Sequence, residues 1–234
     1  MKRLFADFAI SVLFLLLSIQ LLLPLATSLA LSRAARGAVG PDGHVKVEVS
    51  AFPAVKILWG QLDRMTINME GVRPGGIPVS RLATVVDGAR LDIPRLLGLR
   101  EVAVLFRNPA SISVAFSGAD LSSIMRQRVS GLKEPAVSLV PGGAVISGKV
   151  SLVGVVIPVE MSGVFQTNGP KDIRFVPEQL RVSEYSLPAA LEKRLLSRLQ
   201  FQIGVDALPF DIEVDRVLVE GDYLTVTGSS RGRV

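Results

Sequence analysis

The sequence predicts an α+β fold. An N-terminal transmembrane helix is followed by a strongly twisted antiparallel sheet wrapped around two or three amphipathic helices. Three observations lead to this prediction. Residues 8–32 contain no charged side chain. Most later segments alternate apolar and polar residues with a period of two, as half-buried strands do. Two segments instead repeat apolar residues every three to four positions, as amphipathic helices do.

The N-terminal segment has the composition of an export signal. Lys2 and Arg3 precede residues 8–23, which are almost entirely aliphatic. A bilayer core takes about 20 such residues, so the uncharged run is long enough to cross it. Pro24 interrupts this aliphatic run. A buried core helix is an alternative, but core helices are seldom apolar on all sides.

Two fates of this segment remain open. Residues 1–32 are predicted to be an uncleaved signal anchor or a signal peptide. The small residues Ser28 and Ala30 suit cleavage after Ala30, whereas the length of the uncharged run favours an anchor. The short N-terminal tail favours a cytoplasmic N-terminus. Residues 33–234 are therefore predicted to form one extracytoplasmic domain, held at the cell membrane by a single pass.

The rest of the chain predicts a series of strands separated by turns. The alternating segments are residues 44–50, 64–70, 89–93, 111–116, 173–175 and 210–214. Residues 217–227 contain a central Gly-Asp pair, which predicts a hairpin. Residues 102–106 and 155–161 are more uniformly apolar, so both are expected to lie centrally in a sheet. Because the alternating strands each have one polar face, the sheet is expected to be antiparallel.

Two helices are predicted within this domain. Ser117 and Asp120 resemble a capping box at the start of the first. The second is expected to begin near Pro188, a residue tolerated in a first helical turn. A third helix should continue the membrane segment to about residue 38. The apolar stripes are Leu121, Ile124 and Met125 on the first helix, and Leu191, Leu195 and Leu199 on the second.

Composition limits the possible chemistry. The chain of 234 residues has no Cys and one His, which excludes disulfides, thiolate metal sites, a Cys nucleophile and two-His metal motifs. His44 begins an alternating strand and no G-x-S-x-G elbow accompanies it, so we expect a solvated residue. A His44-dependent hydrolase is the alternative. A hard cation could bind the carboxylates of Asp211, Glu213 and Asp215. We expect instead that these residues form an ordinary polar face of a strand. We expect no catalytic residue, metal site or cofactor.

The net charge of +5 has two interpretations. Nucleic acid is not the expected partner, because the basic residues are scattered and aromatic residues amount to only 6%. Since an export segment is present, an anionic membrane surface is the better target. The candidate headgroup-binding residues are Arg126, Lys193, Arg194 and Arg198. Their alternative role is that of an ordinary solvated helix face.

A series of short motifs in a fixed order resembles the bacterial DUF2993 family of exported or membrane-anchored proteins. The motifs are KILWGQLD at 56–63, ADL at 119–121, VEMSG at 159–163, IRFVP at 173–177, LP at 187–188, LPF at 208–210 and VLVEGDYL at 217–224. The resemblance covers roughly residues 24–228. It implies a fold similar to the tubular lipid-binding (BPI-like) superfamily. It also implies binding of membrane phospholipid or glycolipid, in support of lipid transfer or envelope glycolipid assembly, and it implies no catalytic residues.

The two apolar helix stripes are the candidate lipid-binding surface. Each buried acyl methylene contributes about 0.8 kcal/mol, so an apolar groove could hold a lipid chain without polar recognition. In the alternative, the same six side chains only fill a solid core. The protein would then be a non-enzymatic envelope scaffold with a protein partner whose identity the sequence does not give.

Overall fold

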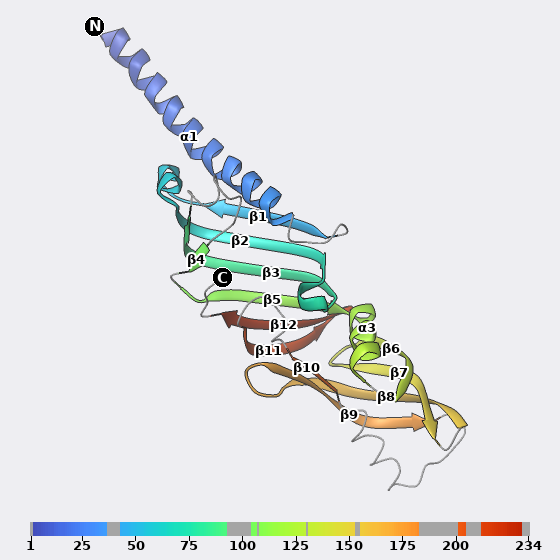
Figure 1. Ribbon diagram of the computed structural model, residues 1–234. Helices are drawn as coiled ribbons and strands as arrows, with labels where there is room; N and C mark the ends of the chain where they lie inside the picture. The colour runs from blue at the N-terminus through green and yellow to red at the C-terminus, as the bar shows by residue number, and fades with distance from the viewer. Residues whose placement is uncertain are drawn as a thin grey trace. The chain divides into compact units, whose positions relative to one another are not determined.

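The computed structural model describes residues 2–36, 43–92, 104–106, 108–129, 131–152, 155–182, 201–204 and 212–230. In chain order the elements are α1 (Lys2–Arg36), β1 (His44–Ser50), η1 (Ala54–Trp59), β2 (Gln61–Val72), η2 (Pro74–Gly76), β3 (Val79–Leu91), β4 (Val104–Phe106), β5 (Ala110–Ser117), α3 (Gly118–Arg128), β6 (Leu132–Val140), β7 (Gly143–Leu152), β8 (Val155–Thr167), β9 (Asp172–Val182), β10 (Phe201–Gly204), β11 (Glu213–Glu220) and β12 (Tyr223–Ser230). An apolar N-terminal helix precedes curled antiparallel sheet, so the predicted α+β class is confirmed (Figure 1).

The described strands form two sheets. The larger has the order β1-β2-β3-β5-β12-β11, with β4 pairing β3, and the smaller has the order β10-β9-β8-β7-β6. The chain also divides into two compact units. Unit 1 comprises residues 1–69, 83–111 and 231–234, and unit 2 comprises residues 70–82 and 112–230. Each unit is described separately below.

In unit 1, α1 continues through Pro24 without a break. The prediction that helix continues beyond the membrane segment is confirmed as far as Arg36, the last residue described there. A proline removes one backbone hydrogen bond of the helix and crowds the preceding turn, but apolar membrane-type helices tolerate this loss. Within α1, the segment Ile10–Arg33 has a mean hydropathy of 2.3 and is long and apolar enough to cross a bilayer.

Strand β1 packs against α1 in unit 1. Its burial alternates strictly, with Val45, Val47 and Val49 inside and the residues between them exposed. This is the pattern that the sequence predicts for residues 44–50. Leu31 of α1 is almost fully buried. The second half of α1 therefore belongs to the packed structure of unit 1.

Strand β4 departs from its predicted position. Residues 102–106 were expected to be central, but among the described residues β4 pairs with β3 alone and lies off the main strand path. The side chain of Leu105 is exposed. A short apolar run does not distinguish a central strand from an edge strand, because both can be uniformly apolar over three residues. Residues 102 and 103 lie outside the described part of the chain.

In unit 2, strands β6 to β9 form an antiparallel meander, with β10 added beside β9. Strand β8 is the middle strand of this sheet, as predicted for residues 155–161. Register shifts interrupt the pairing of β6 with β7 between Lys133 and Ala136, and the pairing of β8 with β9 between Ser162 and Gly163. Such bulges increase the local twist of a sheet. The predicted hairpin is β11–β12, and its turn residue Gly221 has φ +57°.

Candidate functional site

Helix α3 begins at a capping box that the sequence predicts. The Ser117 hydroxyl accepts a hydrogen bond from the backbone N–H of Asp120 at 3.2 Å, and the Asp120 carboxylate accepts one from the backbone N–H of Ser117 at 2.8 Å. The hydroxyl of Ser80 also donates to the Asp120 carboxylate. One carboxylate therefore fixes both the start of α3 and its position relative to the first residues of β3.

Helix α3 lies directly on strand β6. The Ser122 hydroxyl accepts a hydrogen bond from the backbone N–H of Val137 at 2.8 Å and donates one to the carbonyl of Gly118 at 2.6 Å. A Cβ atom at Gly118 would lie only 2.3 Å from the carbonyl oxygen of Val137. Glycine is needed at this position because the helix backbone approaches the strand so closely.

The three candidate lipid-binding residues on α3 share its buried face. Leu121, Ile124 and Met125 are almost fully buried within unit 2. This position suits a core role, and it equally suits contact with an acyl chain in the apolar interior. The residues Leu191, Leu195, Leu199, Lys193, Arg194 and Arg198 lie outside the described part of the chain, so their predicted roles stay predictions.

The interior of unit 2 is lined by large apolar side chains from the five-stranded sheet. Ile146, Met161 and Ile173 are almost fully buried. Phe165, Phe175 and Phe201 form a cluster with ring centroids 5.2 to 6.1 Å apart, the geometry that favours aromatic pairs. The alternation along β7, β8 and β9 places these side chains on one face of the sheet. These side chains form a buried apolar layer on that face of the sheet.

The headgroup candidate Arg126 lies in the last turn of α3. Its side chain is exposed, and its Nε atom lies 3.4 Å from the carbonyl oxygen of Ser122. A cation is favourable at this end of a helix because the unsatisfied carbonyls carry partial negative charge. The guanidinium is therefore accessible from solvent, and its predicted contact with a headgroup stays a prediction.

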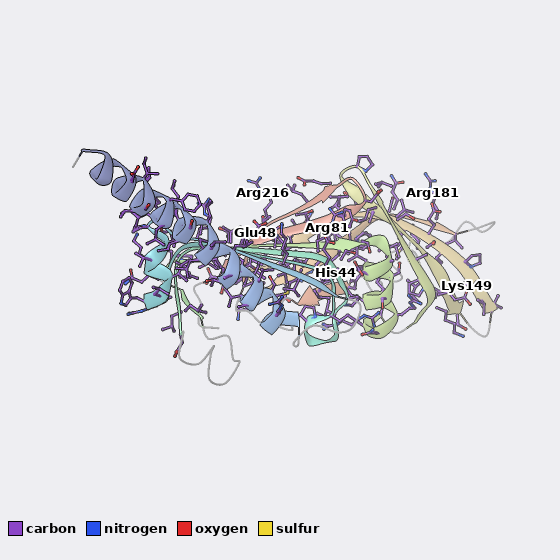
Figure 2. The ribbon with its side chains drawn as sticks, turned by 90° about the horizontal axis from the view of Figure 1, so that it is seen from above. His44, Glu48, Arg81, Lys149, Arg181 and Arg216 are labelled. Atoms are coloured by element: carbon purple, nitrogen blue, oxygen red, sulfur yellow. The ribbon has the colours of Figure 1, made fainter. Side chains whose placement is uncertain are left out.

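The outer face of the five-stranded sheet has a groove of about 480 Å³. Its charged lining residues are Glu134, Lys149, Glu160 and Arg181, and Figure 2 labels Lys149 and Arg181 on this sheet. Lys149 Nζ lies 2.5 Å from Glu134 Oε2. That hydrogen bond and the positive charge of Lys149 hold the pKa of Glu134 below its usual range. Sequence reasoning missed this groove, although alternation already puts these residues on outward positions.

Three polar side chains of α1 hydrogen-bond to the segment from β1 to η1. The hydroxyls of Ser28 and Ser32 accept from the backbone N–H groups of Val49 and Val47, at 3.0 and 2.9 Å. The Gln20 amide accepts from the N–H of Ala54 at 2.8 Å and donates to the carbonyl of Ala51 at 3.2 Å. Through these bonds α1 covers the open edge of β1. A helix that covers the edge of a sheet protects it from pairing with another chain.

This edge-covering role was missed by sequence reasoning. Ser28 was considered only as a small residue near a cleavage position, and Gln20 only as an exception in an apolar run. The available signal was their spacing. Gln20, Ser28 and Ser32 are separated by multiples of four residues, which puts them on one face of a helix.

The remaining polar candidates are exposed. His44 is exposed at the start of β1, as expected for a solvated residue, and Figure 2 labels it with Glu48 on the same strand. Glu213 and Asp215 are exposed on β11, and Asp211 lies outside the described residues. Within the described part of the chain, no group of three or more His, Cys, Asp or Glu side chains could hold a metal ion.

Comparison with known proteins gives one match. A family model described as LmeA-like phospholipid-binding matches residues 20–229, which is most of the chain. The match begins at Gln20 and extends into β12, so it includes the second half of α1 and both sheets. It agrees with the lipid-binding character that the DUF2993 resemblance implies. No curated protein and no solved structure matches the chain. The chain belongs to the LmeA-like phospholipid-binding family.

Proposed function

We propose that this chain is a membrane-anchored, extracytoplasmic protein that binds phospholipid or glycolipid in the apolar interior of unit 2, without catalysis. The observation that carries the proposal is the match to a phospholipid-binding family over residues 20–229. The process it would serve is lipid transfer or the assembly of envelope glycolipids.

The proposed mechanism uses apolar contact alone for the acyl chain. The buried face of α3 and the aromatic cluster around Phe175 offer the lining that such a chain requires. Ten buried methylenes would contribute about 8 kcal/mol before the cost of association. The exposed guanidinium of Arg126 would attract an anionic headgroup. Lys193, Arg194 and Arg198 are proposed to act in the same way.

The anchor part of the proposal uses α1. Its segment Ile10–Arg33 has the length and hydropathy of a membrane span. Cleavage after Ala30 would remove Gln20 and Ser28, which hydrogen-bond to the backbone of Ala54 and Val49. Those bonds support retention of α1 as an anchor.

The composition is compatible with binding without catalysis. A binding module needs neither a nucleophilic Cys nor a second His, and the chain has neither.

Cross-linking with a photoactivatable phospholipid tests the binding site. The full chain would be reconstituted in nanodiscs that contain a phospholipid with a photoreactive group at the end of one acyl chain. We expect adducts on peptides from α3 and from the inner face of β7 to β9, in addition to adducts on α1. Unlabelled phospholipid in excess should reduce the adducts in unit 2.

The alternative is an envelope scaffold with a solid core. In that case adducts would be confined to α1 and to surface residues, and excess phospholipid would not change the pattern in unit 2. A parallel assay would follow transfer of a fluorescent phospholipid from donor vesicles to acceptor vesicles that carry the chain. Transfer at the rate of chain-free vesicles would count against a role in lipid transfer.

A further inference from the structure

Unit 1 has a cluster of exposed apolar side chains where η1 lies beside α1. Phe52 is 75% exposed, Leu58 60% and Trp59 64%, and Val55 is also exposed. We call these four residues the tip. Exposed large apolar side chains that gather in one place mark a surface that binds something apolar.

The backbone of the tip is held in a defined shape. Ala54 and Ile57 are buried beneath it. The Asp63 carboxylate accepts a hydrogen bond from the backbone N–H of Phe52 at 2.6 Å. Gly60 ends η1 with φ +71°, and a Cβ atom there would lie 2.0 Å from the carbonyl oxygen of Leu91. The outward position of the apolar side chains is therefore fixed by their neighbours.

Gln20 sets the position of the tip along α1. Its amide makes hydrogen bonds of 2.8 and 3.2 Å with the backbone of Ala54 and Ala51, on either side of Phe52. Figure 1 shows η1 beside the middle of α1, in agreement with their packing. The tip is thus level with Gln20 and not with the C-terminal end of the helix.

Gln20 lies within the stretch of α1 that a bilayer would cover. The uncharged run starts at Phe8, and at about 1.5 Å per residue Gln20 lies about 18 Å along it. A bilayer core is about 30 Å thick. Beyond Gln20, the side of α1 away from β1 still exposes leucines, namely Leu21, Leu22, Leu25 and Leu29. Lipid that covers those leucines would also surround the tip.

We propose that the tip inserts into the bilayer leaflet on the domain side, next to the point where α1 emerges. The occupant of this apolar surface is therefore membrane lipid. The inference rests on the anchor part of the proposed function. Insertion of the tip would give unit 1 a second contact with the membrane beside α1 and would keep it against the lipid surface.

Trp59 is the one tryptophan of the chain and reports its own surroundings. The full chain would be reconstituted in nanodiscs of phosphatidylcholine and phosphatidylglycerol, with and without acyl-brominated phosphatidylcholine. We expect brominated lipid to quench most of the Trp59 fluorescence and acrylamide in the solvent to quench little of it. The exposed pair Phe52→Ser with Leu58→Ser should reverse both effects while the chain stays in the disc.

His44 provides the matched control position. It is exposed at the end of β1 remote from η1, beside the C-terminal part of α1. In the double variant Trp59→Phe with His44→Trp, acrylamide should quench the tryptophan and brominated lipid should not. Equal quenching by lipid at both positions would overturn the proposal, because the tip would not be the inserted part.

Two further results would overturn the inference in different ways. If the chain stays in the disc but Trp59 is quenched only by acrylamide, the tip is not in lipid, although the anchor stands. If alkaline carbonate extracts the chain from membranes, α1 is no anchor, and both the inference and that part of the proposed function fail. Lipid binding by unit 2 is read separately, from the cross-linked peptides.

Discussion

The hydroxyls of Ser28 and Ser32 are predicted to protect the edge of β1. In the parent chain, the backbone N–H groups of Val49 and Val47 lie 3.0 and 2.9 Å from the hydroxyl oxygens of Ser28 and Ser32. The double variant Ser28→Ala with Ser32→Ala removes both acceptors. A buried N–H left without a partner costs about 1–3 kcal/mol. Each 1.4 kcal/mol is a factor of ten in an equilibrium constant. The two amides should therefore exchange about 5- to 150-fold faster.

Hydrogen exchange measured at single residues, on the full chain in nanodiscs, is the assay. Ser18→Ala is the matched control, because the Ser18 hydroxyl donates only to the Phe14 carbonyl of its own helix, at 2.8 Å. That control should leave β1 unchanged, since such bonds add little to helix stability. Unchanged exchange of Val47 and Val49 in the double variant would refute the reasoning. An equal acceleration by Ser18→Ala would refute it as well.

Three other variants test separate parts of the account. Gly118→Ala should lower the free energy of unfolding by about 1–3 kcal/mol through overpacking against Val137, measured by denaturant titration beside Ala119→Gly, which creates no clash. The bond from Phe52 N–H and the charge of Lys56 lower the pKa of Asp63. Asp63→Asn should therefore be less stable than the parent above the ordinary carboxyl pKa, and this difference should vanish as the pH falls through the lowered pKa. His44→Ala should leave phospholipid cross-linking unchanged. A loss of cross-linking in this variant would support a functional role for His44.

Local signals explain what the sequence predicts well. The start of α3 depends on Ser117 and Asp120, which lie within one turn, so the capping box is visible in the sequence. The strict alternation of β1 is equally local. The α3 stripe of Leu121, Ile124 and Met125 was predicted as one apolar face, and all three residues are buried.

Features that depend on distant partners were not predictable in the same way. The partners of Ser28 and Ser32 lie 21 and 15 residues away in the sequence. The tip at Trp59 was not recognised, because the exposure of an apolar residue depends on what the fold leaves uncovered and not on the local pattern.

The central claim is that lipid enters the apolar interior of unit 2, and methionine methyl groups test it most directly. Met125 and Met161 are fully buried in unit 2, whereas Met65 is buried in unit 1. The full chain with labelled methionine methyls would be placed in nanodiscs that contain a phospholipid spin-labelled on its acyl chain. The account predicts selective broadening of the Met125 and Met161 signals, with Met65 unchanged. Sharp signals from both unit 2 methionines, in a chain that remains in the disc, would contradict it.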